Sequence, residues 1–245
     1  MGFQEKIIEG KYNFTKDKSV YCEEFFKLFQ DSSPQGNYTF NSEIMSRVET
    51  GEFLKIYIDY KLTYQFEPVS VRIKRSLGSK KSTELYAVNQ KDKLLQYSFT
   101  SKLGSGDCEK QIHTKFHISC PSFASSLAMT HHRKPDPVHR TPYMVINSMN
   151  IWKYENPFIE GMAHVELVNS EPRDIKMQSG HEVQAIHMKL FDEDRLSNPH
   201  GKGHDFYISK YYQIPYKAEF LNGITVEIET LKNYQVDHSY LFKKD

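Results

Sequence analysis

Several features that mark particular protein classes are scarce or missing in this sequence. Its 245 residues include only three cysteines, Cys22, Cys108 and Cys120, whose odd number and wide spacing fit a reducing compartment better than a disulfide scaffold. No run of about 18 apolar residues occurs, so the sequence contains no transmembrane helix. The net charge is only +1, which argues against a nucleic-acid partner.

The N-terminal sequence MGFQEKIIEG also lacks the apolar segment of a secretory leader. Lys6 stands where N-myristoylation requires Ser or Thr. We therefore expect a cytoplasmic protein, or a periplasmic or secreted one whose leader has been removed. The sequence gives no indication of the oligomeric state.

Signatures of catalysis are missing as well. The segment Ser119-Cys120-Pro121-Ser122 lacks the glycines of a nucleophile elbow. The GSG at 104–106 lies between two expected strands, so it is interpreted as a turn rather than a phosphate-binding loop. The sequence therefore names no reaction, and no cofactor is expected.

Strand signals, in contrast, are abundant. There are 16 Phe and 16 Tyr against a single Trp, and aromatic residues favour β-strands. From about residue 37 to residue 231, apolar and polar residues alternate with a period of two. In the clearest case Leu54, Ile56, Ile58, Tyr60 and Leu62 share one face. The other expected strands, separated by turns rich in Gly, Pro and Asn, are 69–75, 84–88, 93–99, 112–120, 141–152, 161–168, 181–191, 204–209 and 224–231.

One segment departs from this period. In residues 17–30, DKSVYCEEFFKLFQ, the side chains of Phe25, Leu28 and Phe29 recur at helical spacing. Asp17 or Ser19 can cap the start of a helix, and SSPQG at 32–36 can end it. The pattern predicts one α-helix at about 17–30.

Consecutive strands joined by short turns imply an antiparallel meander, and the twist of so many strands curls the sheet. We therefore predict a mainly β protein whose meander forms a barrel or an incomplete barrel, with the N-terminal α-helix packed on the concave face. No linker or internal repeat divides the chain, so residues 1–245 are expected to form a single β domain. The long irregular segment 121–141 is a candidate site, because long loops on β scaffolds often carry function.

This order of elements resembles a known group of proteins. A helix, the segment GNYTFNSEIMSRVETGEFLKIYIDYKLTYQF at 36–66 and a long meander are similar to the curved, incomplete barrels of the LolA/LolB-like lipoprotein carriers and the lipocalin-like proteins. The resemblance spans about residues 15–230 in the order of elements. It implies a cup that holds acyl chains or another lipophile, and it transfers no residue roles.

Eleven histidines are the most unusual part of the composition. His113 and His117 lie on one predicted strand, and His131, His132 and His139 follow in the loop at 121–141, so several of them could meet at one mouth of the cup. Histidine titrates near neutral pH and suits acid–base chemistry, but none of these residues falls in a metal-binding motif. No metal site is assigned, and the candidate catalytic residues are His117, His131, His132, Tyr143 and Asp205.

Aromatic residues near strand ends are the candidate ligand contacts. Trp152, Tyr154 and Phe158 either line the mouth of the cup or close the end of the core. Tyr207 belongs to the aromatic segment 206–216, and a tyrosine offers an amphiphilic ligand both an apolar ring and a hydroxyl. The candidate ligand-binding residues are therefore Trp152, Tyr154, Phe158, Tyr207 and His139.

These observations favour a protein that binds a hydrophobic or amphiphilic small molecule in the cavity of a β-barrel or cup. The alternative is an enzyme, an isomerase, cyclase or lyase that uses His and Tyr for acid–base chemistry on a lipophilic substrate. A third possibility is a structural or protein-interaction domain. A largely apolar cavity would favour the binding protein. A cavity in which His meets Asp or Glu would favour the enzyme, and a filled core would favour the structural or interaction domain.

Overall fold

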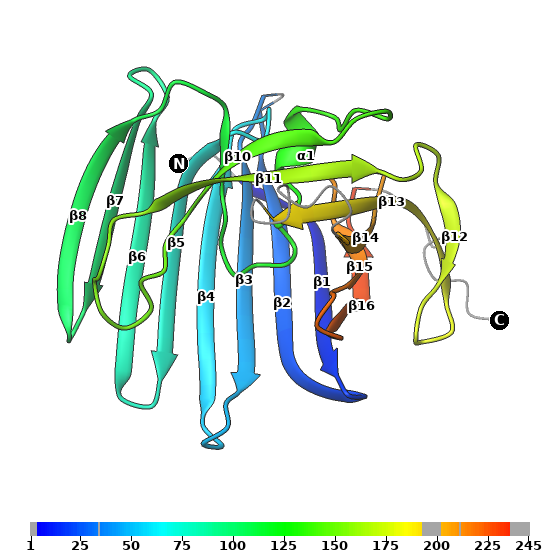
Figure 1. Ribbon diagram of the computed structural model, residues 1–245, viewed down its shortest axis with the longest axis horizontal. Coiled ribbons are helices and arrows are strands. Elements are labelled where there is room, and N and C mark those ends of the chain that lie inside the picture. Colours follow the sequence, from blue (N-terminus) through cyan, green and yellow to red (C-terminus); the bar gives the residue numbers. More distant parts are fainter. Residues whose placement is uncertain (1–3, 34, 193–201, 211, 236–245) are drawn as a thin grey trace.

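The computed structural model describes residues 4–33, 35–192, 202–210 and 212–235, which form β-strands and one short helix (Figure 1). The N-terminal half contributes β1 (Gln4–Lys16), β2 (Ser19–Asp31), β3 (Tyr38–Arg47), β4 (Phe53–Leu62), β5 (Pro68–Leu77), β6 (Lys80–Asn89), β7 (Leu94–Ser101) and β8 (Gly104–Gln111). The rest of the chain contributes β9 (Phe116–Ile118), α1 (Met129–His132), β10 (Thr141–Asn147), β11 (Ile159–Leu167), β12 (Arg173–Lys176), β13 (Glu182–Asp192), β14 (His204–Ile208), β15 (Pro215–Glu219) and β16 (Thr225–Asn233).

The strands form one continuous, mostly antiparallel sheet. Strands β1 to β8 pair in chain order, and β1 also pairs with β16. From β16 the sheet continues through β15, β14, β13, β11 and β10 to β9, while β12 pairs with β13 beside this path. The antiparallel meander predicted from the alternating pattern is confirmed, with one parallel pair, β9 and β10, as the exception.

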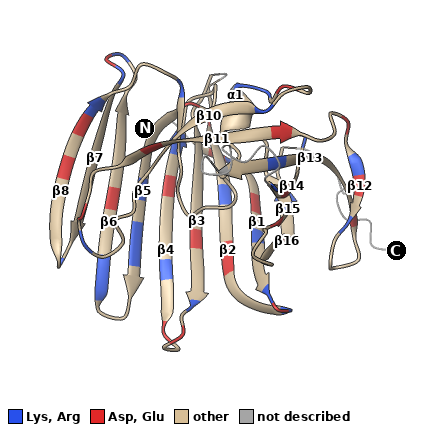
Figure 2. Cartoon of the chain, viewed as in Figure 1, with Lys and Arg blue, Asp and Glu red and all other residues tan. Residues whose placement is uncertain are grey.

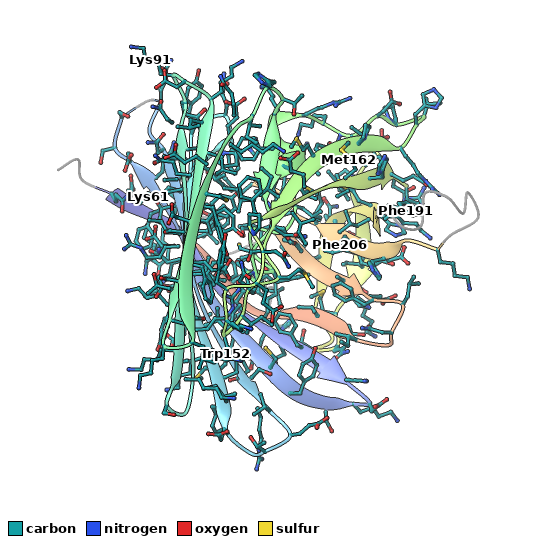
Figure 3. The ribbon with its side chains drawn as sticks, turned by 60° about the vertical axis from the view of Figure 1, so that its left-hand side comes forward. Lys61, Lys91, Trp152, Met162, Phe191 and Phe206 are labelled. Atoms are coloured by element: carbon teal, nitrogen blue, oxygen red, sulfur yellow. The ribbon has the colours of Figure 1, made fainter. Side chains whose placement is uncertain are left out.

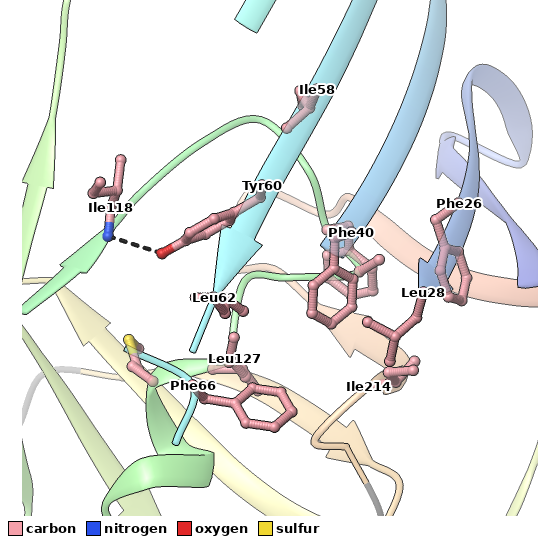
Figure 4. Close-up of a cluster of buried hydrophobic side chains, with 14 of the residues drawn as sticks. Phe26, Leu28, Phe40, Ile58, Tyr60, Leu62, Phe66, Ile118, Leu127 and Ile214 are labelled. Carbon is pink, nitrogen blue, oxygen red and sulfur yellow. Dashed lines mark hydrogen bonds between the residues drawn. The ribbon is translucent and has the colours of Figure 1, made fainter. Parts of the chain in front are cut away.

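The sheet curls into an incomplete barrel. The barrel is open because the two ends of the sheet, β8 and β9, do not pair with each other. Strand β9 instead lies against the inner face of β4. The amide of Ile118 donates to the hydroxyl of Tyr60 over 3.2 Å, and Nδ1 of His117 lies 3.1 Å from the same oxygen (Figure 4). The last strand of the path therefore enters the interior formed by the first ones.

The predicted helix at 17–30 is wrong, because this segment is the strand β2. Cys22, Glu24, Phe26 and Leu28 face the interior and are buried, which is a period of two rather than of 3.6, whereas Phe25 is 44% exposed. The carboxyl group of Glu24 occupies an inward position that the sequence pattern assigns to an apolar residue. It therefore interrupts the alternation on which strand prediction depends.

The turn before β2 also shows why the segment is a hairpin. Asp17 and Lys18 have φ of 50° and 65°, and positive φ at both central residues is the mark of a two-residue type I′ turn. This turn joins β2 to β1, a strand that lies before the range in which strands were expected. The expected strands also lacked β3, β8, β12 and β15, and the pattern extended β9 and β10 beyond their observed ends.

The interior is filled by the chain between β9 and β10 rather than by an N-terminal helix. We call residues 119–133 the plug; they include the four-residue helix α1, and most of their apolar side chains are buried. The ring of Phe123 lies 4.9 Å from that of Tyr12 on β1 and 5.8 Å from that of Phe206 on β14. The plug therefore connects both halves of the sheet, and Figure 3 shows side chains filling the space between them.

The plug is attached to the sheet by the buried carboxyl group of Glu24. Ser122 donates its hydroxyl to this group over 2.7 Å, and the amide of Phe123 donates over 2.8 Å. The hydroxyl of Ser122 is also 2.8 Å from that of Ser42 on β3. These hydrogen bonds offset part of the free-energy cost of burying the carboxyl group of Glu24. The residue that disturbs the strand pattern thus fixes the position of the plug.

A second buried polar group lies on the inner face of β5 to β7. Arg75 and Glu84 form an ion pair that is almost fully buried, and the hydroxyl groups of Tyr86 and Tyr97 also donate to Glu84. The side chain of Arg75 therefore points inward from β5 to pair with Glu84. The three cysteines carry free thiols.

Candidate functional site

A cavity of about 340 Å³ lies between the plug and strands β9 to β11. His117, Val145 and Gly161 are register partners on three adjacent strands, so they lie side by side in its wall. Gly161 has no side chain, which leaves space beside Val145. The full lining comprises His117, Ser119, Cys120, Ser126, Met129, Val145, Asn147, Ile159, Glu160, Gly161, Met162, Ala163 and Leu190.

The lining of this cavity is amphiphilic. Its apolar side chains come mainly from β10, β11 and β13, and they include Val145, Ile159 and Leu190. Its polar side chains come mainly from β9 and the plug, and they include His117, Ser119 and Ser126. A concave site with apolar walls and a few polar groups is typical of small-molecule binding.

His117 is the predicted acid–base residue that lines this cavity, and it is buried. Burial raises the pKa of the Tyr60 hydroxyl well above its usual value, so this group stays protonated at neutral pH. Because its oxygen already accepts the amide hydrogen of Ile118, its own hydrogen is available for Nδ1 of His117. The Tyr60 hydroxyl thus holds the imidazole of His117 in place in the cavity wall.

The thiol of Cys120 lines the same cavity but is poorly suited to act as a nucleophile. Burial raises its pKa to about 11, and the hydrogen bond with Ser125, at 3.6 Å between sulfur and oxygen, offsets only part of that effect. A thiol with such a pKa is protonated at neutral pH, and the thiolate is the reactive form. Cys120 therefore contributes to packing in the cavity wall rather than to covalent chemistry.

The predicted loop histidines do not join His117 at this cavity. His131 stacks on Phe66 with ring centroids 3.8 Å apart, and burial, followed by the charge of Lys134, lowers its pKa. His139 is exposed, and its amide donates to Asp136. His132 ends α1, but its side chain lies outside the described part of the structure.

Tyr143 and Asp205 are also apart from the cavity lining. The hydroxyl of Tyr143 donates to the carbonyl of Arg133 over 2.6 Å, and burial raises its pKa. Asp205 lies on β14 opposite to the inward-facing Phe206 and contacts Nε2 of His187 over 2.6 Å. It therefore belongs to the outer face of β13 and β14. The predicted ligand contact Tyr207 lies on that face too, where its ring stacks on His187 at 4.6 Å.

The three predicted rim aromatics pack together against β7 and β8. Phe158 meets the ring of Tyr97 edge-on at 6.2 Å, and the carbonyl of Trp152 accepts the Ser101 hydroxyl over 2.7 Å. Tyr154 covers Gly106 so closely that a Cβ atom at that glycine would overlap its ring. Figure 3 shows Trp152 far from Met162, which lines the cavity. Half-buried rings in this place close the end of the core.

Asn147 lines the cavity but was not among the site residues predicted from the sequence, and its environment is unusual. Its Oδ1 atom is buried and has no hydrogen-bond partner among the described residues. The alternation in TPYMVIN places Asn147 on the same face as Val145, and this signal was available in the sequence. Strand β9 and the plug carry no comparable signal, because their positions depend on contacts with β2 and β4.

A hollow of about 420 Å³ also lies over the outer face of β2 to β5. Its lining includes Phe25 and Tyr57 together with charged side chains of both signs, such as Asp59 and Arg72. Figure 2 shows the two signs interspersed along these strands, and Arg72 of β5 lies opposite Asp59 of β4. This hollow differs from the cavity in its charge, because it is lined by several Lys, Arg, Asp and Glu residues, whereas Glu160 is the acidic residue that lines the cavity and no described Lys or Arg lines it.

The described residues contain neither a metal-binding cluster nor a membrane-spanning helix. Within the described ranges, no three His, Cys, Asp or Glu side chains gather closely enough to hold a metal ion. None of the described helices has the length and apolar character needed to cross a membrane.

Comparison with known proteins adds information about the fold alone. No family model and no curated protein matches the chain. The crystal structure of a beta-barrel-like protein of domain of unknown function DUF1849 from Brucella abortus is similar, with a TM-score of 0.53 and 8% sequence identity over 94% of this chain and 98% of that chain. The likeness supports a barrel-like fold, and it does not single out the LolA/LolB-like or lipocalin-like proteins.

Proposed function

We propose that the protein binds a small amphiphilic molecule in the cavity between the plug and strands β9 to β11. The observation that carries this proposal is the division of the lining into an apolar side, with Val145, Ile159 and Leu190, and a polar side, with His117, Ser119 and Ser126. A molecule with a short apolar chain and a polar head group matches both sides at once. This function agrees with the cup implied by the resemblance to lipid-binding barrels.

The enzymatic alternative has less support. Of the predicted acid–base residues, Tyr143 bonds to Arg133 and Asp205 bonds to His187, and neither lines the cavity. His117 is in the right place, but it contacts Tyr60, whose hydroxyl also accepts a backbone amide and so has a structural role. Binding without chemistry is therefore the function that the geometry supports best.

The proposal is tested by filling the cavity. Val145→Phe extends a ring over the space beside Gly161, and Val138→Phe is the matched control because Val138 is 77% exposed in a loop. A lipophilic dye such as Nile red, whose fluorescence rises in apolar sites, reports binding. We expect Val145→Phe to weaken dye binding at least about tenfold, which is about 1.4 kcal/mol.

Val138→Phe should bind the dye as the unmodified protein does. Circular dichroism of both variants checks that the sheet is intact. The proposal is contradicted if the unmodified protein does not bind the dye, or if both variants bind it equally well.

A further inference from the structure

The charge of the cavity lining restricts the ligand further, given the function proposed above. Among the described residues that line it, none is Lys or Arg. The acidic side chain in the lining, Glu160, forms an ion pair with Lys110 of β8. An anionic head group would therefore lose its hydration without gaining a cationic partner, and burying an unpaired charge is costly.

The same reasoning applies to a cationic head group. Glu160 is already neutralised by Lys110, so an ammonium group would have to compete with that lysine. Of the other polar groups in the lining, Ser119, Ser126 and Asn147 are uncharged, and burial keeps the thiol of Cys120 protonated. They offer hydrogen bonds but no net charge.

Asn147 indicates what kind of hydrogen bonding the head group needs. Its buried amide oxygen is an acceptor with no partner among the described residues. A hydroxyl group can both donate and accept, so it pairs with an asparagine amide in either orientation of that amide. In the observed orientation of the amide, a carboxylate, which only accepts, would place a second acceptor against the amide oxygen of Asn147.

We propose that the ligand of this cavity carries an uncharged hydroxyl head group, as in a fatty alcohol or a monoacylglycerol, and that Asn147 is its hydrogen-bond partner. The apolar chain lies along Val145, Ile159 and Leu190. This inference rests on the proposed function and specifies the chemical class of its ligand.

Three compounds with the same alkyl chain separate the head groups: decanol, decanoate and decylamine. At about pH 8 the acid is anionic and the amine is cationic. Each compound, below the concentration at which it forms micelles, competes with Nile red. We expect decanol to displace the dye at a concentration at least about tenfold lower than either charged compound, since an unpaired buried charge is strongly disfavoured.

The role of Asn147 is tested with Asn147→Leu, which keeps the approximate size of the side chain but removes its polar atoms. In this variant the ratio of decanol affinity to dye affinity should fall about tenfold. The matched control is Asn37→Leu, because Asn37 is exposed and does not line the cavity.

The outcomes distinguish the two proposals. If all three compounds displace the dye equally, or if a charged compound is preferred, the head-group inference is overturned while small-molecule binding stands. If none displaces it and Val145→Phe has no effect on the dye, both are overturned. If decanol is preferred but Asn147→Leu does not alter its affinity, the assignment of Asn147 is wrong.

Discussion

Glu24 is a carboxylic acid that faces the inside of a barrel and is completely buried. Burial raises the pKa of its carboxyl group, and the hydrogen bonds from Ser122, Ser42 and the amide of Phe123 oppose that rise without cancelling it. The folded protein therefore holds this proton to higher pH than the unfolded chain does. The resulting stability is fully present below the usual pKa of 4.5 and is lost as pH rises through the pKa of the folded state.

The direction of this pH dependence can be measured with Glu24→Gln. This substitution removes the titrating group but keeps an oxygen that accepts from Ser122 and Phe123. The unfolding free energy of the unmodified protein, minus that of the variant, should fall as pH rises from about 4.5 and become constant above the raised pKa. Urea unfolding over a pH series provides the values. Glu5→Gln, at an exposed position, is the control for losing a carboxyl group. A difference that increases with pH would mean that the hydrogen bonds outweigh burial.

At the scale of elements, the hairpin of β1 and β2 is the feature that the sequence concealed. Its turn residue Lys18 adopts φ of 65°, a left-handed conformation that costs an L-residue roughly 1–2 kcal/mol and costs glycine little. Glycine at position 18 should therefore stabilise the hairpin, whereas it would destabilise the helix predicted for 17–30.

We expect Lys18→Gly to stabilise the protein by up to about 1 kcal/mol, as measured by the midpoint of urea unfolding. In a helix the same change would destabilise by a similar amount. Lys16→Gly, at the end of strand β1, is the control and should not stabilise, because glycine weakens strands. Loss of stability in Lys18→Gly would contradict the type I′ turn.

The short strand β9 pairs with β10 and contacts β4 through the hydroxyl of Tyr60. Tyr60→Phe removes the hydroxyl that accepts from the amide of Ile118, leaving a buried donor without that partner (Figure 4). We expect a loss of about 1–3 kcal/mol in unfolding free energy and faster hydrogen exchange at the Ile118 amide. Tyr57→Phe changes a 44% exposed ring on the same strand and should have neither effect. Unchanged exchange at Ile118 would mean that β9 is held by other contacts.

At the scale of the whole molecule, the plug packs against both the first and the last strands of the sheet. Phe123 contacts Tyr12 and Phe14 of β1 and Phe206 of β14, so its ring lies where the first strands and the last strands meet. A filled centre explains why an open sheet keeps the shape of a barrel without pairing between β8 and β9.

Phe123→Ala should destabilise the protein by about 3–5 kcal/mol, because it leaves a cavity where both halves meet. Thermal unfolding followed by circular dichroism and by tyrosine fluorescence should shift to lower temperature by the same amount with both probes. Phe53→Ala, at a 56% exposed ring, is the matched control and should change the unfolding temperature little. Separate transitions for the two probes would show that the plug does not couple the halves.

The sequence by itself determined the mainly antiparallel β class and the strands with strict alternation, such as β4 and β5. Alternation is a local property, since it depends only on which face of one strand is buried. The tertiary structure decided the identity of β2, where the partners of inward-facing Glu24 come from a plug almost 100 residues later in the chain. It also decided which residues share the cavity. His117, Asn147 and Leu190 meet there because the sheet curls until its last strand lies against β4, and no local pattern encodes a contact between strands so distant in sequence.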